Sequence, residues 1–125
     1  MSTKLHDIPN NAQISAAFTP RALTTTTNSN ALDFAAGDHR CCAIQQIGAV
    51  SGTTPSLAGK IQESSDQSTW TDISGATFTA VTTTDNVQSI SFDRTKRYLR
   101  FVATITGTTP SFQIAALIIE QKKQI

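Results

Sequence analysis

A chain of 125 residues can form one domain that buries about two-thirds of its unfolded surface without disulfides or metal. Apolar residues make up 38% and charged residues 15% of it, and threonine and serine fill much of the remainder, which favours β-structure over helix. The formal net charge of +1 argues against the broad basic surface of a nucleic-acid-binding protein.

The first segment is predicted to be an extended N-terminal arm over residues 1–20, followed by a β-sandwich domain over residues 21–125. Apolar residues in the arm follow neither the period of a strand nor that of a helix. The segment is nevertheless too apolar for a fully solvated tail, so we expect it to lie across its own body or a partner. The residues expected to anchor it are Leu5, Ile8, Ile14 and Phe18.

The rest of the chain alternates short runs of strand-forming residues with turn residues. The predicted strands cover residues 22–27, 31–34, 40–50, 57–64, 70–73, 78–81, 87–92, 98–106 and 112–121. About eight strands at this spacing, without a helical pattern, predict an all-β, antiparallel, jelly-roll-like β-sandwich.

Two short segments repeat each other, SGTTPSL at residues 51–57 and TGTTPSF at residues 106–112. Each follows one apolar run and precedes another, and glycine and proline favour turns, so two hairpin loops are predicted. The alternative is a pair of loops at one end of the sandwich that contact the same surface. The residues concerned are Gly52, Thr53, Thr54, Pro55, Gly107, Thr108, Thr109 and Pro110.

The last two strands differ in their pattern. In residues 98–106 the apolar side chains alternate with mostly polar ones, Val102 being the exception, which predicts a strand exposed on one side. Residues 114–119 are apolar on both faces, which is typical of a strand covered twice. The second cover must come from the arm, a loop or another chain. Leu117 and Ile119 are therefore predicted to lie on a self-association surface.

The two cysteines, Cys41 and Cys42, are adjacent in a predicted strand, where neighbouring side chains point to opposite faces. We expect reduced thiols that pack as small apolar residues. The sequence has no apolar run of about 18 residues, so no transmembrane helix is predicted, and residues 1–10 lack the apolar run of a signal peptide. Folding in a cytoplasm is the expectation.

Residues that could carry catalysis or bind a ligand are sparse. His6 and His39 have no metal-ligand spacing, and no nucleophile elbow or phosphate-binding loop occurs, so we predict no enzyme and no cofactor. Asp66 and Asp72 flank a turn but offer too few oxygens for calcium, and no metal is predicted. Trp70, the sole tryptophan, fits either the core or a platform for stacking a sugar.

Two strings bring the chain close to a known group. Residues 59–73 (GKIQESSDQSTWTDI) and 97–112 (RYLRFVATITGTTPSF) resemble motifs of small virion proteins of tailed bacteriophages. The resemblance covers residues 40–121, and within that group it is greatest to capsid decoration, or cement, proteins. It implies a β-sandwich on the outside of an icosahedral head, with the major capsid protein and further copies of itself, as a homodimer or homotrimer, as partners. The arm matches no motif of the group.

Three function classes follow. The first is a non-enzymatic virion protein that cements the capsid exterior, with no nucleic-acid or membrane partner. The alternative is a receptor- or glycan-binding sandwich of a tail or fibre, because the turn around Trp70 also occurs in sugar-binding domains. An enzyme is the third, without a motif in its favour.

Overall fold

The computed structural model of the chain describes residues 12–34 and 37–122, and these residues form antiparallel β-structure without a helix. None of the described residues forms a helix long and apolar enough to cross a membrane. The predicted all-β class is confirmed. The strands are β1 (Ala12–Leu23), β2 (Thr27–Asn28), β3 (Leu32–Asp33), β4 (Gly37–Ser64), β5 (Thr71–Thr77), β6 (Asn86–Asp93) and β7 (Tyr98–Lys122).

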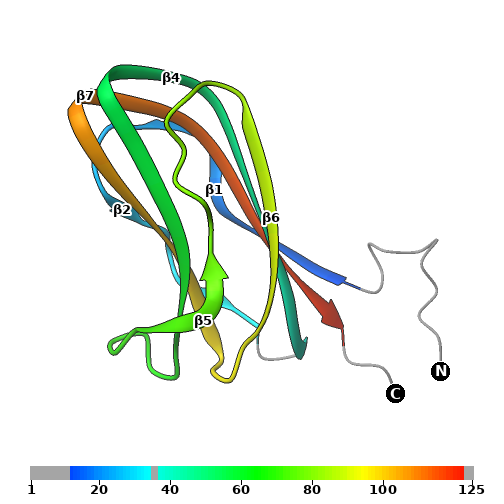
Figure 1. Cartoon of the computed structure of the whole chain (residues 1–125). Coiled ribbons are helices and arrows are strands. Elements are labelled where there is room, and N and C mark those ends of the chain that lie inside the picture. Colours follow the sequence, from blue (N-terminus) through cyan, green and yellow to red (C-terminus); the bar gives the residue numbers. More distant parts are fainter. Residues whose placement is uncertain (1–11, 35–36, 123–125) are drawn as a thin grey trace.

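Two long strands, β4 and β7, organise the fold. They pair antiparallel from Gly37 opposite Lys122 to Ser64 opposite Tyr98, with local register shifts. Midway the pair bends sharply, so that its two arms lie over each other as two layers (Figure 1). The same two strands therefore supply the centre of both layers.

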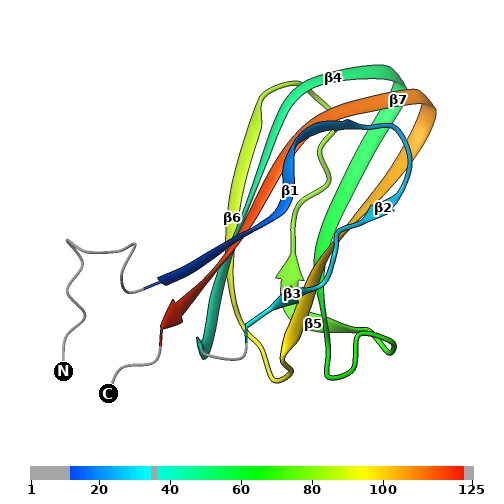
Figure 2. The same cartoon turned by 180° about the vertical axis from the view of Figure 1, so that it is seen from behind.

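Each layer is completed by the shorter strands. In the β1 sheet, β1 pairs with the C-terminal arm of β7, which pairs with the N-terminal arm of β4, which pairs with β6. In the β5 sheet, β2 and β3 pair with the N-terminal arm of β7, and β5 pairs with the C-terminal arm of β4. This connectivity is that of a jelly roll. The expected number of strands is met because β4 and β7 each serve both sheets (Figure 2).

The core lies between the two sheets. Phe101 is its centre, with Phe18 edge-on at 5.4 Å and Phe78 stacked at 5.6 Å between ring centroids. Leu99, Phe101, Ala103 and Ile105 all point inward, as the alternation in residues 98–106 predicts. Val102, the exception in that pattern, is also buried, although it lies on the outward side.

The N-terminal boundary of the sandwich differs from the prediction. Residues 12–20 belong to β1 and pair with β7, so the sandwich begins at Ala12 rather than at residue 21. Two register shifts, on either side of Phe18, break the period-two pattern that would have revealed a strand. Pro20 is compatible with β1 because this strand lies at the edge of its sheet. Leu5 and Ile8 lie outside the described residues, so an arm over residues 1–11 stays a prediction.

The two repeated segments are not hairpin loops, and that prediction is wrong. Both lie within continuous strands, at the corner where β4 and β7 bend together. Gly52 (φ 112°) and Gly107 (φ 120°) have a positive φ, a backbone conformation that glycine adopts readily and other residues rarely adopt. A methyl group on Gly52 would lie 2.7 Å from the carbonyl oxygen of Thr109, and one on Gly107 2.8 Å from that of Thr54. The two segments thus pack on each other at one end of the molecule.

The opposite end is held by buried polar groups. The Arg94 guanidinium pairs with Glu120 and donates to the carbonyl groups of Phe34 and Lys96. Both side chains of the ion pair are almost fully buried. Glu63 accepts hydrogen bonds from the backbone and hydroxyl groups of Thr95 and from the Lys96 amide. These contacts join the loop after β6 to both sheets.

Candidate interaction surface

The outer face of the β1 sheet is largely apolar. Residues directly opposite each other on neighbouring strands point to the same side of a sheet, so the register defines rows of side chains. Two adjacent rows cross all four strands of the sheet. They consist of Ile14, Ile119, Cys42 and Ser91, and of Ala16, Leu117, Ile44 and Ser89.

Three large apolar residues are exposed in the part of the chain that the structure describes, and all belong to this face. Ile14 is 51% exposed, Leu117 36% and Val87 67%. Val87 lies opposite Gln46, in the row next to Leu117. Fully burying an exposed side chain of this kind is worth about 1.5–3 kcal/mol, and covering the part still in contact with water recovers a share of that, so the face favours a partner.

Some of the residues predicted from sequence meet here and some do not. Ile14, Leu117 and Ile119 lie side by side in the two rows. Phe18 is 2% exposed and belongs to the core, because the register shift beside it turns its side chain inward. The contributions of Cys42 and Ile44 were missed, although the CCAIQQI pattern of residues 41–47 also carries apolar residues on both faces.

The rows themselves carry no charged residue. The next row contains Gln121 and Arg40, and the Arg40 guanidinium pairs with Asp93 at 3.2 Å. The ion pair of Arg40 with Asp93 is well exposed, so solvent screens it and it adds little stability. The face is therefore apolar at its centre and neutral at this edge.

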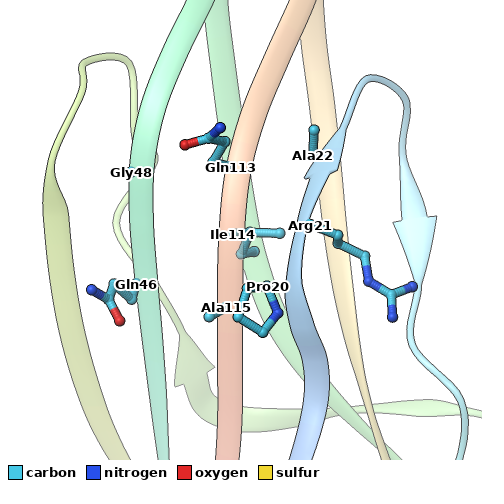
Figure 3. A pocket seen from close by; sticks show the side chains of 8 residues that line it. All are labelled: Pro20, Arg21, Ala22, Gln46, Gly48, Gln113, Ile114 and Ala115. Carbon is cyan, nitrogen blue, oxygen red and sulfur yellow. The ribbon is translucent and has the colours of Figure 1, made fainter.

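A hollow of about 430 Å³ adjoins the apolar rows on the same face (Figure 3). It forms where the register of β1 shifts after Phe18 and where Gly48 on β4 has no side chain. Figure 3 shows the Arg21 side chain directed away from β7, and its guanidinium donates to Thr19. The residues that line the hollow are Pro20, Arg21, Ala22, Gln46, Gly48, Gln113, Ile114 and Ala115.

The outer face of the β5 sheet has the opposite chemistry. Lys60 pairs with Asp72 at 3.1 Å, Gln62 donates to Asp72 at 2.8 Å, and Arg100 donates to Gln62 at 2.9 Å. The Arg100 guanidinium lies 4.5 Å from the centroid of the Trp70 ring. The hydrogen bond from Gln62, with the contact to Lys60, lowers the pKa of the Asp72 carboxyl below its usual value. These polar groups satisfy one another.

This arrangement settles the roles considered for Trp70 and the two aspartates. Trp70 lies half-buried on the surface, so it is not a core residue, and the Arg100 guanidinium covers one face of its ring. Asp66 caps its turn by accepting from the amides of Ser68 and Thr69, and these bonds lower its pKa. Residues 12–34 and 37–122 contain no cluster of three side chains able to hold a metal ion.

The two cysteines point to opposite faces, as predicted, and both are free thiols. Cys41 is buried beside Glu120, with 3.6 Å between its Sγ atom and the carboxylate. Burial, reinforced by this negative charge, raises the pKa of the Cys41 thiol to about 12, which makes it unreactive. Cys42 is half-buried within the first apolar row. His39 is exposed, and its carbonyl accepts a backbone hydrogen bond from Arg94; His6 lies outside the described residues.

Comparison with known proteins finds likeness of fold only. The sequence matches no protein-family model and no curated protein. XepA, an exported protein of PBSX, superposes with a TM-score of 0.59 at 17% identity over 90% of this chain, which spans 38% of XepA. YomS, derived from the SPBc2 prophage, superposes with a TM-score of 0.54 at 13% identity, covering 88% of this chain and 94% of YomS.

A xylanase domain from a termite hindgut metagenome (Trinervitermes trinervoides), CBM36-1, also superposes. Its TM-score is 0.49 at 12% identity, over 91% of this chain and all of that domain.

Proposed function

We propose that this protein is a non-enzymatic structural protein of a bacteriophage virion, which binds the outside of the capsid and stabilises the shell. The observation that carries the proposal is a jelly roll with one self-satisfied polar face and one apolar face exposed for assembly. YomS, which has a similar fold, derives from a prophage, and this supports a phage source.

The residues that resemble phage virion proteins form one cluster in the fold. Residues 59–64 of the first string run along β4 beside residues 98–103 of the second on β7, with Gly59 opposite Ala103, and the first string then turns into β5. The bonds between Gln62, Arg100 and Asp72 all join residues of these two strings. A shared polar cluster of this kind is a physical reason for the two strings to occur together.

The contact with the major capsid protein is assigned to the corner. Thr53, Thr54, Thr108 and Thr109 are exposed there, on two backbone segments that support each other at Gly52 and Gly107. A rigid, neutral tip loses little conformational entropy when it binds. Many copies binding only the assembled shell would stabilise it by mass action.

Co-sedimentation tests the proposal. Purified protein is added to DNA-filled phage heads assembled without it, and we expect it to pellet with the heads at a saturating stoichiometry. The double variant Thr53→Glu/Thr108→Glu should lose this binding, because both side chains are exposed at the corner. The matched control, Ser65→Glu/Ser74→Glu, adds the same charge at exposed positions away from the corner and should pellet normally.

A glycan array gives the outcome that would reverse the conclusion. Protein that stays in the supernatant with heads but binds defined glycans would identify the receptor- or glycan-binding alternative. Loss of that glycan binding in Trp70→Ala would then assign it to the β5 sheet.

A further inference from the structure

We infer that a second copy of this chain covers the apolar outer face of the β1 sheet, the two faces packing against each other about a two-fold axis. The inference rests on that face and does not depend on attachment to a capsid.

The size of the face suits a partner of this kind. Its side chains form four rows across four strands, from the row of Gln121 to the row of Val87. With strands about 4.8 Å apart and rows about 6.8 Å apart, the face covers roughly 500 Å² per copy. Two copies would bury roughly 1,000 Å², which is the lower limit for a specific interface between proteins. We therefore expect a reversible dimer rather than an obligate one.

The shape of the face allows interdigitation. Within the two apolar rows, the large side chains of Ile14, Ile119, Leu117 and Ile44 lie next to small ones such as Ala16 and Ser89. The hollow beside Gly48 adds a recess at the end of the face. Stacked sheets pack about 10 Å apart with side chains of each layer between those of the other, as these rows permit.

The charge of the face favours a second copy over a charged partner. The apolar rows are uncharged, and Arg40 and Asp93 at their edge neutralise each other, so two copies meet without net repulsion between like charges. The outer face of the β5 sheet carries the charged groups of Lys60, Arg100 and Asp72, and covering it with a second copy would remove these groups from water at a cost. The β1 sheet is therefore the face that can meet itself.

Sedimentation equilibrium over a range of concentrations tests the inference. The wild-type chain should dimerise, and Val87→Asp and Leu117→Asp should each weaken the dimer by at least about tenfold. Val87 is the more exposed of the two, so its variant keeps the fold testable if Leu117→Asp is insoluble. Thr104→Asp, which adds the same charge to the exposed outer side of the β5 sheet, should dimerise like the wild type.

The two thiols report which face is covered. Alkylation of Cys42 by iodoacetamide should slow as the protein concentration rises, whereas in Val87→Asp it should stay fast at every concentration. Buried Cys41 should remain unmodified throughout, as a control within the same molecule.

A wild-type chain that stays monomeric near 1 mM would overturn the inference, as would dimers whose Cys42 labels at the monomer rate. Monomeric Val87→Asp that still pellets with heads would show that capsid attachment stands on its own. Wild-type dimers that do not bind heads would support dimerisation and contradict the proposed attachment to the capsid.

Discussion

The two outer faces of the sandwich are built on the same two strands and yet have opposite chemistry. On the β5 sheet, Lys60, Gln62 and Arg100 are joined to one another directly or through Asp72. On the β1 sheet, the further arms of the same strands present Ile44 and Leu117. Polar side chains can satisfy each other on a surface, but exposed apolar side chains leave water only when another surface covers them.

The comparison separates association from fold stability. The two outer faces determine which surfaces associate. The stability of the fold comes from what lies between the faces: the aromatic core, the corner and the buried ion pair. Substitutions between the faces should therefore lower the free energy of unfolding, and substitutions on the faces should change association or acid stability instead.

The largest expected effect is that of Arg94→Met. It leaves the Glu120 carboxylate buried without its partner, so we expect a loss of about 3–5 kcal/mol in the free energy of unfolding. Arg40→Met is the matched control, because it breaks the exposed pair with Asp93 and should remove at most about 1 kcal/mol. Urea denaturation measures both, and equal losses would contradict a fold anchored between its faces.

The corner comes next, since β4 and β7 serve both faces only by bending there. Gly107→Ala combines a strained backbone with a methyl group pressed against Thr54, and should remove about 2–4 kcal/mol. Gly75→Ala is the matched control: its φ of 79° is also positive, but no atom lies within 4 Å of the added methyl. It should remove about 1–2 kcal/mol, by strain alone. Similar losses in the two variants would mean that the corner is not tightly packed.

Local patterns predicted the parts of this fold that depend on local rules. Alternation in residues 98–106 predicted which side chains face the core, and the doubly apolar run of residues 114–119 predicted an unusual outer face. Both follow from the period of a strand. The same pattern predicted that Leu117 lies on that outer face.

The errors arose where long-range pairing decides the structure. Gly-Thr-Thr-Pro has the same local chemistry in a hairpin turn and in a bend, and only the pairing of β4 with β7 along both arms distinguishes them. The register shifts hid β1 in the same way, because a bulge breaks the periodicity. The contact of Arg94 with Glu120 joins the loop after β6 to β7, which no local pattern indicates.

A smaller effect is expected at Trp70, on the polar face. A double-mutant cycle of Trp70→Ala and Arg100→Met should give a coupling of about 0.5–1 kcal/mol, the usual size of an exposed cation–π contact. The dimer should be unaffected, because neither residue lies on the β1 sheet. A coupling near zero would mean that the contact between Arg100 and the Trp70 ring adds no stability. A weakened dimer would contradict the separation of the two faces.

The smallest effect concerns acid, and it should distinguish the faces without a change in packing. The pKa of Asp72 is lowered from its usual 3.8 by the hydrogen bond from Gln62 and by Lys60, and that of Asp66 by the amides of Thr69 and Ser68. A carboxyl group whose pKa is lower in the folded than in the unfolded state stabilises the fold above the unfolded value. That contribution is lost as the pH falls through the folded value.

The melting temperature of the wild type should therefore fall as the pH is lowered from about 5 to below 3.8. Asp66→Asn/Asp72→Asn should have a lower melting temperature at neutral pH and a smaller further decrease in acid. The apolar rows of the β1 sheet carry no carboxylate, so dimerisation should change less than melting over the same range. The dimer dissociation constant and the melting temperature, measured at each pH, test this. An equal acid response in the double variant would mean that other carboxylates set the acid stability.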